Sequence, residues 1–347
     1  MARLRLIDNL QEADNKALTG ALQSAHLNFL IGSGASLPAI PAAGNVESRI
    51  AELFAEDRER EALTAMYEFL RSIQSPMNRL IRGEADGQND ECVSNYSDLL
   101  ALIEIILVER RTDLLPKQAN VFTTNYDLFI EKASESHAGI RLNDGFARVP
   151  SLERRMVFSP QSFFDATFST GSLYNYKVEV PAVNLIKLHG SFSWKANQAG
   201  EVTFHVAAAD GLGEDPMLHP LRVYVRQFAG SVVLPQVQKF RETIMNQTYY
   251  DLLRIYQNQL DKENSLLISF GFSFGDEHIL DITRRALKNI TLKMIVVAYD
   301  EAAAARYQKV FQANSNVEIL APADGETIDF SRLVEFLRRL VPTRWSS

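Results

Sequence analysis

Cysteine is almost absent from this chain of 347 residues, with Cys92 as its single example. One thiol excludes an intramolecular disulfide framework and a cysteine-based zinc ribbon, and it fits a reducing compartment. No uninterrupted apolar run reaches the length that spans a membrane. Residues 1–8 also lack the long apolar segment of a secretory signal. We therefore expect a cytoplasmic protein.

The chain has no excess of positive charge. It contains 36 Lys and Arg residues against 43 Asp and Glu residues, for a formal net charge of −7. This balance provides no overall electrostatic attraction to nucleic acid or to an anionic membrane, so we expect neither as a direct partner. Hydrophobic residues make up 46% of the chain, which is typical of a globular protein, and the length suits one large α/β domain with insertions or two ordinary domains.

The last third of the chain alternates between strand and helix patterns. We predict strands at 265–270, 292–298 and 317–320, and helices at 277–287, 302–311 and 330–340. Three further buried strands are expected at 27–31, 119–123 and 183–188. Alternation of this kind indicates βαβ units, so the predicted fold class is α/β with a doubly wound, Rossmann-like parallel sheet.

The remaining segments are interpreted as additions to this one domain, 1–347. Spaced apolar residues from Leu6 to Ser24 predict an amphipathic N-terminal helix within residues 1–25. Residues 45–115 are predicted as a helical insertion that starts near Asn45 and is interrupted by a polar loop at 83–89. Further predictions are a hairpin strand at 202–207, a loop-rich segment at 191–235, a long helix at 236–260, and no confident element at 139–180.

A glycine-rich loop follows the first predicted strand. Its residues are Gly32, Ser33, Gly34, Ala35 and Ser36. Glycines let backbone amides approach a pyrophosphate closely, and the two serines add hydroxyl donors. Leu37 stands where the third glycine of the dinucleotide-binding fingerprint would be, so a plain tight turn is the alternative interpretation.

A polar segment, Thr-Thr-Asn-Tyr-Asp at 123–127, follows the second predicted strand, and a helix is predicted to start near Asn125 and Asp127. Its side chains suit contacts to a ribose or an amide. The alternative is an ordinary helix N-cap, in which Thr124 or Asn125 satisfies the first amides of the helix.

His189 comes directly after the third predicted strand, at the edge where open α/β folds bind ligands. An imidazole there can exchange a proton near neutral pH, or it can simply cap the strand. A further loop, Gly-Phe-Ser-Phe-Gly-Asp at 271–276, follows the strand at 265–270. His278 is interpreted as a polar residue in the first turn of the next helix, with a second acid or base as the alternative.

Four strand ends therefore carry polar or glycine-rich loops, at 32–36, 123–127, 189–191 and 271–276. Parallel strands bring these ends to one edge, which predicts a ligand crevice. The sequence has no convincing metal-ligand cluster, nucleophile elbow or Walker lysine loop. Carboxylates without a distinctive partner, such as Glu131, are interpreted as solvated surface.

Taken in order, these loops resemble the sirtuin-like NAD-binding fold over roughly residues 25–300. That family carries a G-A-G-x-S loop, a Q-N-x-D segment, an H-G pair and a G-T/S-S-type loop. The counterparts here are residues 32–36, 124–127, 189–190 and 271–273. The chain departs from the family in lacking the four-cysteine zinc ribbon of classical deacylases and in having Thr124 in place of the glutamine.

More narrowly, the segments at 123–127, 187–191 and 271–276 resemble bacterial sirtuin-like proteins of antiphage defence. Those proteins typically hydrolyse NAD rather than deacylate lysine. They often act beside a short Argonaute or a HerA-type hexameric ATPase. The resemblance implies an NAD+ hydrolase with a separate partner of this kind, and the predicted helical surfaces suggest a homo-oligomer. The alternatives are an NAD- or ADP-ribose-sensing subunit without turnover, and a protein deacylase or ADP-ribosyltransferase.

The resemblance also implies roles for individual residues. Asn125 and Asp127 would hold the nicotinamide ribose, and His189 would be the general base. The remaining residues implied in NAD binding are Gly32, Ser33, Gly34, Ala35, Ser36 and Thr124 around the pyrophosphate and ribose, and Gly271, Ser273 and Asp300 toward the adenosine. No metal ion is implied.

Overall fold

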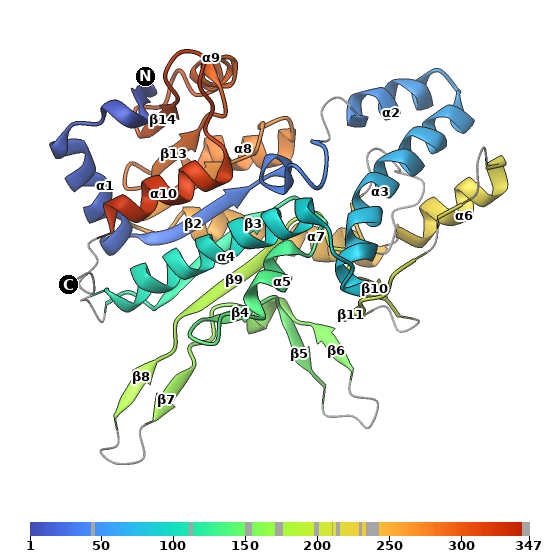
Figure 1. The fold of residues 1–347 in the computed structure, drawn as a ribbon, viewed down its shortest axis with the longest axis horizontal. Helices are drawn as coiled ribbons and strands as arrows, with labels where there is room; N and C mark the ends of the chain where they lie inside the picture. The colour runs from blue at the N-terminus through green and yellow to red at the C-terminus, as the bar shows by residue number, and fades with distance from the viewer. Residues whose placement is uncertain are drawn as a thin grey trace.

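The computed structural model is built on one large parallel sheet (Figure 1). It describes residues 1–42, 46–110, 114–149, 155–170, 176–197, 201–209, 211–212, 216–228, 231–233 and 243–341. The strands, in spatial order, are β1 (Arg3–Leu6), β14 (Val317–Ala321), β13 (Lys293–Val297), β12 (Ser265–Phe270), β2 (His26–Ile31), β3 (Gln118–Thr123), β9 (Ala182–Lys187) and β4 (Arg141–Asn143). Every neighbouring pair is parallel. The sheet confirms the predicted Rossmann-like α/β class.

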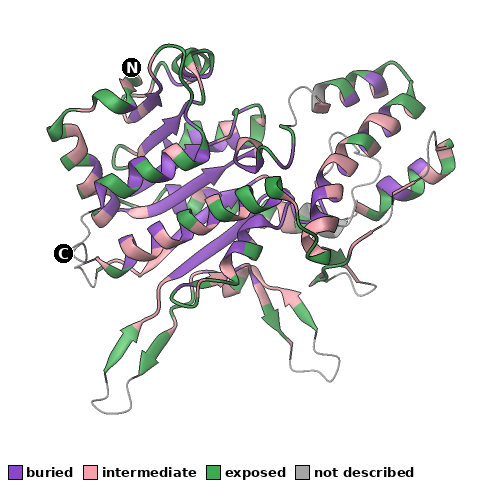
Figure 2. Cartoon of the chain, in the orientation of Figure 1, coloured by how far each residue is buried: buried purple, intermediate pink, exposed green. Residues whose placement is uncertain are grey.

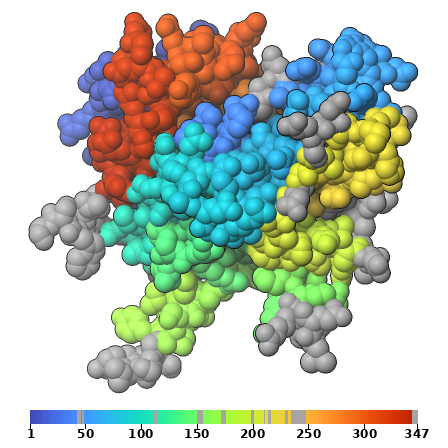
Figure 3. All heavy atoms as spheres, turned by 45° about the vertical axis from the view of Figure 1, so that its right-hand side comes forward, coloured from blue at the N-terminus to red at the C-terminus, as the bar shows by residue number. Residues whose placement is uncertain are grey.

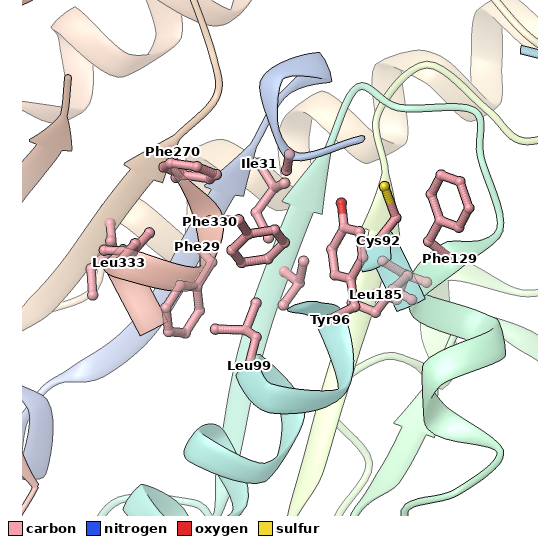
Figure 4. Close-up of a cluster of buried hydrophobic side chains, with 14 of the residues drawn as sticks. Phe29, Ile31, Cys92, Tyr96, Leu99, Phe129, Leu185, Phe270, Phe330 and Leu333 are labelled. Atoms are coloured by element: carbon pink, nitrogen blue, oxygen red, sulfur yellow. The ribbon is translucent and has the colours of Figure 1, made fainter. Parts of the chain in front are cut away.

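Helices cover both faces of this sheet, with α1 (Glu12–Ser24), α4 (Gly87–Val108) and α10 (Phe330–Leu340) on one and α7 (Thr243–Leu260), α8 (Glu277–Ala286) and α9 (Glu301–Val310) on the other (Figure 1). Side chains alternate between faces along a strand, so each face has its own core. In β2, Phe29 packs into the core under α4 and α10, whereas Leu30 packs into the core under α7. Figure 4 shows the first of these cores, where Phe330 of α10 lies beside Phe29 of β2 and meets the ring of Tyr96 of α4 edge-on.

A row of buried asparagines crosses the sheet on the α7 side. Asn28, Asn120, Asn184 and Asn143 occupy paired positions on β2, β3, β9 and β4. Asn120 Nδ2 donates to Asn28 Oδ1 (2.8 Å), Asn184 Nδ2 donates to Asn120 Oδ1 (3.0 Å), and Asn143 Nδ2 donates to Asn184 Oδ1 (3.2 Å). A slip of one residue in any pair would break this chain of amides and bury its groups without partners, so the row holds the strands in register.

Smaller elements extend from this body (Figures 1 and 3). The helices α2 (Val46–Ala55), α3 (Glu59–Arg82) and α6 (Leu218–Phe228) lie together at one side of the sheet, and α5 (Phe129–Ser134) packs against α4. The remaining strands are β5 (Phe146–Arg148), β6 (Met156–Phe158), β7 (Phe168–Thr170), β8 (Lys177–Glu179), β10 (Trp194–Ala196) and β11 (Val202–Phe204). The antiparallel pair β7–β8 projects as an arm that is largely exposed in Figure 2, whereas β5 and β6 form one side of a small four-stranded sheet with β11 and β10.

The N-terminal prediction is wrong in part. Residues Arg3–Leu6 form the edge strand β1 rather than the start of a helix, and the helix begins only at Glu12. The short Arg-Leu-Arg-Leu sequence is compatible with either a strand or the start of a helix. Pairing with β14 and the ion pairs of Arg5 with Asp14 (2.6 Å) and Glu318 (3.9 Å) select the strand.

Two other segments differ from the predictions. Residues 139–180, where no element was expected, contain β4–β8. The loop-rich segment 191–235 contains β10 and the helix α6, and β11 confirms the hairpin strand predicted at 202–207. Pro220 lies in the first turn of α6, where a proline removes no helical hydrogen bond. The proline is therefore compatible with a helix in the segment that was predicted to be rich in loops. The α2–α3 break at Asp57, with φ of 60°, was not predicted either. The predicted helix start near Asn45 and the first residues of the 236–260 helix lie outside the described residues.

Within the part of the chain that the structure describes, no helix is both long enough and apolar enough to cross a membrane.

We predict that Asn120→Leu lowers the free energy of unfolding by about 2–4 kcal/mol, because it leaves Asn28 and Asn184 short of a buried hydrogen-bond partner. Chemical denaturation measures this change. Asn9→Leu is the matched control, since Asn9 is exposed and its replacement should change stability by no more than about 0.5 kcal/mol. Equal, small effects of the two substitutions would show that the amide row contributes nothing to stability.

Candidate active site

The carboxyl ends of β2, β3, β9 and β12 lie at one edge of the sheet, as predicted, and their loops line one cavity of about 620 Å³. Nine of the residues proposed from the sequence lie on its wall: Ser33, Gly34, Ser36, Thr124, Asn125, Asp127, His189, Gly271 and Ser273. Apolar residues close one side, with Leu37 and Ile40 from the turn after Ser36 and Phe69 and Ile73 from α3.

A short chain of hydrogen bonds joins the loop after β2 to the loop after β3. Asn125 Nδ2 donates to Ser36 Oγ (2.9 Å) and to Gly32 O (3.0 Å), and Ser36 Oγ donates to Asp127 Oδ2 (2.6 Å). All three side chains are buried. Both amide hydrogens of Asn125 are thus occupied by the protein, so its Oδ1 is the amide atom that can accept a hydrogen bond from a ligand.

Asn125 and Asp127 do not begin a helix, contrary to the prediction. The helix α5 starts at Phe129, and its N-cap, Leu128, makes no side-chain capping bond. Backbone carbonyls just before it are occupied from outside: Phe192 N donates to Tyr126 O (3.1 Å), and Lys187 Nζ donates to Asp127 O. These long-range bonds hold 124–128 out of helical geometry, and the N-cap interpretation of Thr124 and Asn125 is wrong.

The two glycine-rich loops pack backbone against backbone. Gly34 N donates to Gly271 O (3.0 Å), and Gly32 N donates to Phe270 O (3.0 Å). A Cβ on Gly32 would lie 2.4 Å from Gly271 O, and one on Gly34 would lie 2.8 Å from Gly271 Cα. Gly271 itself has a φ of 64°, which disfavours any residue with a side chain.

These contacts change how the first glycine loop is understood. The amides of Gly32, Gly34 and Ala35 all donate to protein carbonyls, whereas the sequence suggested that such amides would face a pyrophosphate. Gly32 and Ala35 are also absent from the residues that line the cavity. In this structure the glycines serve the contact between loops, and the polar groups that this loop presents to the cavity are those of its serines.

His189 has a partner that the sequence did not reveal. Its Nε2 lies 2.9 Å from Asp276 Oδ2, although the two groups are not aligned as a hydrogen bond. Asp276 is also the N-cap of α8, since its Oδ1 accepts from Ile279 N (3.0 Å). Burial raises the pKa of Asp276, but His189 and the capping amide outweigh that effect, so its pKa is lowered and its carboxylate stays ionised.

Lys187, two residues before His189, is buried beneath the site. Its Nζ pairs with Glu131 Oε1 (2.7 Å) and donates to Ser191 Oγ (3.1 Å) as well as to Asp127 O. The prediction that Glu131 is solvated surface is therefore wrong. Burial raises the pKa of Glu131, and the charge of Lys187 opposes this rise. The pair ties β9 to α5 directly below Asn125 and His189.

Two other residues considered from the sequence, Asp300 and His278, lie outside the cavity wall. Asp300 is the N-cap of α9, where its Oδ1 accepts from Ala303 N (2.7 Å), and it is not among the residues that line the cavity. His278 is exposed in the first turn of α8, as interpreted from the sequence. Among the described residues, no group of three or more His, Cys, Asp or Glu side chains is placed to hold a metal ion.

We predict that Lys187→Met lowers the free energy of unfolding by about 3–5 kcal/mol, because it leaves the Glu131 carboxyl buried without its cation. The double variant Lys187→Met with Glu131→Leu should recover more than half of that loss, since it removes both charges. Urea denaturation of the two single variants and the double variant completes the cycle. A double variant as unstable as the sum of the single variants would contradict a coupled pair.

Comparison with known proteins relates the chain to one described family. No curated protein matches the chain. A solved structure described as a complex of a Sir2 homolog with NAD is similar to it at 14% identity, with 93% of each chain covered and a TM-score of 0.45. The model of the family described as the SIR2-like domain matches residues 119–320, which is more than half of the 347 residues and runs from β3 to β14. The chain therefore belongs to the SIR2-like domain family.

Proposed function

We propose that this protein is an NAD+ hydrolase that cleaves the bond between nicotinamide and ribose and releases nicotinamide and ADP-ribose. One observation carries the proposal: four strand ends bring Asn125, Asp127 and His189 to a single cavity of about 620 Å³. That volume lies in the range of small-molecule and cofactor sites. Membership of the SIR2-like family supports NAD as the substrate.

Cleavage proceeds through an oxocarbenium-like ribose, whose positive charge needs a fixed negative group. Asp127 provides it, because Ser36 and the backbone amide of Phe129 (3.3 Å) hold its carboxylate. Asn125 Oδ1 accepts a hydrogen bond from a ribose hydroxyl and orients the sugar. As the bond from C1′ to the ring nitrogen breaks, its electron pair goes to that nitrogen, and the pyridinium becomes neutral nicotinamide.

Water completes the reaction. Its oxygen forms the new bond to C1′, and one of its protons passes to the imidazole of His189, which then returns the proton to solvent. Nε2 faces the Asp276 carboxylate at 2.9 Å, which favours a proton on that nitrogen and leaves the lone pair of the neutral ring on Nδ1. The Asp276 carboxylate, 2.9 Å away, stabilises the imidazolium that forms.

We further propose that the enzyme depletes NAD in antiphage defence, in the cytoplasm, as a homo-oligomer with a separate HerA-type hexameric ATPase. The support is the resemblance of the segments at 123–127, 187–191 and 271–276 to defence proteins that work in this way. An enzyme that destroys NAD must be held inactive until infection, which gives a partner its purpose. The exposed β7–β8 arm offers surface for such contacts.

Asn125→Ala and His189→Ala should each lower nicotinamide release from NAD by at least about 100-fold, the scale of general acid–base and orienting contributions. Asp276→Asn should lower it by about tenfold while keeping the helix cap, because asparagine is also a good N-cap. The exposed His278→Ala is the control and should retain full turnover. Chromatography of nicotinamide measures release, and full activity of the Asn125 and His189 variants would overturn the site.

Nicotinamide release should rise at least tenfold when the purified chain is mixed with the product of a neighbouring ATPase gene. Activation requires that the two proteins bind each other, and size-exclusion chromatography of the mixture measures this binding. NAD binding by calorimetry without release, alone and with the partner, would instead identify a sensing subunit and would contradict the hydrolase.

A further inference from the structure

The cavity extends well beyond the three catalytic candidates. Along the edge of the sheet the strands follow the order β9, β3, β2, β12 and β13, with His189 at the first end and Tyr299 at the last. Adjacent strands are about 4.8 Å apart, so this edge spans about 19 Å. A dinucleotide with its nicotinamide ribose at Asn125 therefore places its adenosine half beside β13 and α9. This placement rests on the proposed function.

Arg306 of α9 is the one arginine or lysine among the described residues that line the cavity. Its side chain forms no ion pair or hydrogen bond with any residue that the structure describes, in contrast to the buried Lys187. The nearby Tyr307 has its hydroxyl committed to Phe272 O (3.0 Å). Burial raises the pKa of Tyr307; the charge of Arg306 opposes this rise, and the charge of Asp300 adds to it. Arg306 is thus a cation at the cavity wall that no described carboxylate pairs with.

The same end of the cavity lacks a carboxylate that could hold a free ribose. Its described lining consists of Val297, Tyr299, Ala303, Arg306 and Tyr307. Asp300, the acid at the end of β13, is turned into the N-cap of α9 through its 2.7 Å bond to Ala303 N. In dinucleotide-binding α/β folds, an acid selects the free 2′-hydroxyl of NAD, whereas a nearby arginine accommodates the 2′-phosphate of NADP.

We propose that Arg306 recognises a phosphate on the 2′-oxygen of the adenosine ribose, so that the site takes 2′-phosphorylated dinucleotides of the NADP class as well as NAD. The guanidinium would form charge-assisted hydrogen bonds with that phosphate at the rim of the cavity, where the arginine is exposed. Arg306 is in this sense a specificity-determining residue, remote from the bond that breaks.

Calorimetry with ADP-ribose 2′-phosphate and with ADP-ribose tests this assignment. Both probes lack the bond that the enzyme is proposed to cleave, so binding is measured whether or not the chain is a hydrolase. The wild-type chain should bind the 2′-phosphate form at least tenfold more tightly, and Arg306→Ala should remove that preference while changing the Kd of ADP-ribose by less than twofold. Lys309→Ala is the matched control, because Lys309 is an exposed cation on the same helix that does not line the cavity.

Two results would overturn the assignment. Equal binding of the two probes by the wild-type chain would show that the site does not read the 2′-position. An equal loss for both probes in Arg306→Ala would assign the arginine to the pyrophosphate. Release of nicotinamide from NAD and NADP is measured in parallel, and an absence of release from both with selective probe binding intact would refute the hydrolase proposal alone.

Discussion

The parallel register of β2, β3, β9 and β12 is the constraint on which the site depends. Each loop comes from a distant part of the sequence, and the loops meet only because their strands end at the same level of the sheet. The buried row of Asn28, Asn120 and Asn184 supports this alignment, because hydrogen-bonded amides tolerate no slip in an otherwise apolar core. The buried asparagine row thus helps to align the strand ends that carry the polar residues of the cavity.

Above the sheet, the loops hold one another without a ligand. Gly32 and Gly34 pack against Gly271, and Asn125 reaches across to Gly32 O and Ser36. The close contact of the two backbones is by itself enough to require glycine at these positions. Side chains held in this way lose little entropy when a substrate binds, which favours a preorganised site.

Much of the fold could be predicted, because alternating strand and helix patterns in the last third leave few arrangements other than a parallel sheet. Asn125, Asp127 and His189 could be predicted as neighbours for the same reason. The start of α5 could not, since Lys187 and Phe192 take its preceding carbonyls from elsewhere in the chain. The edge strand Arg3–Leu6 was missed because its partner, β14, lies at the other end of the sequence.

Local sequence patterns were enough to predict six of the eight strands of the sheet, the order of its polar loops and the kinds of side chain at each strand end. These depend on local periodicity and on residues within a few positions of one another. The tertiary structure decided which charges are paired: His189 with Asp276, Lys187 with Glu131, and Asp300 with the amides of its own helix rather than the cavity. Pairing depends on distances of a few ångströms between segments far apart in the chain, and only packing sets those distances.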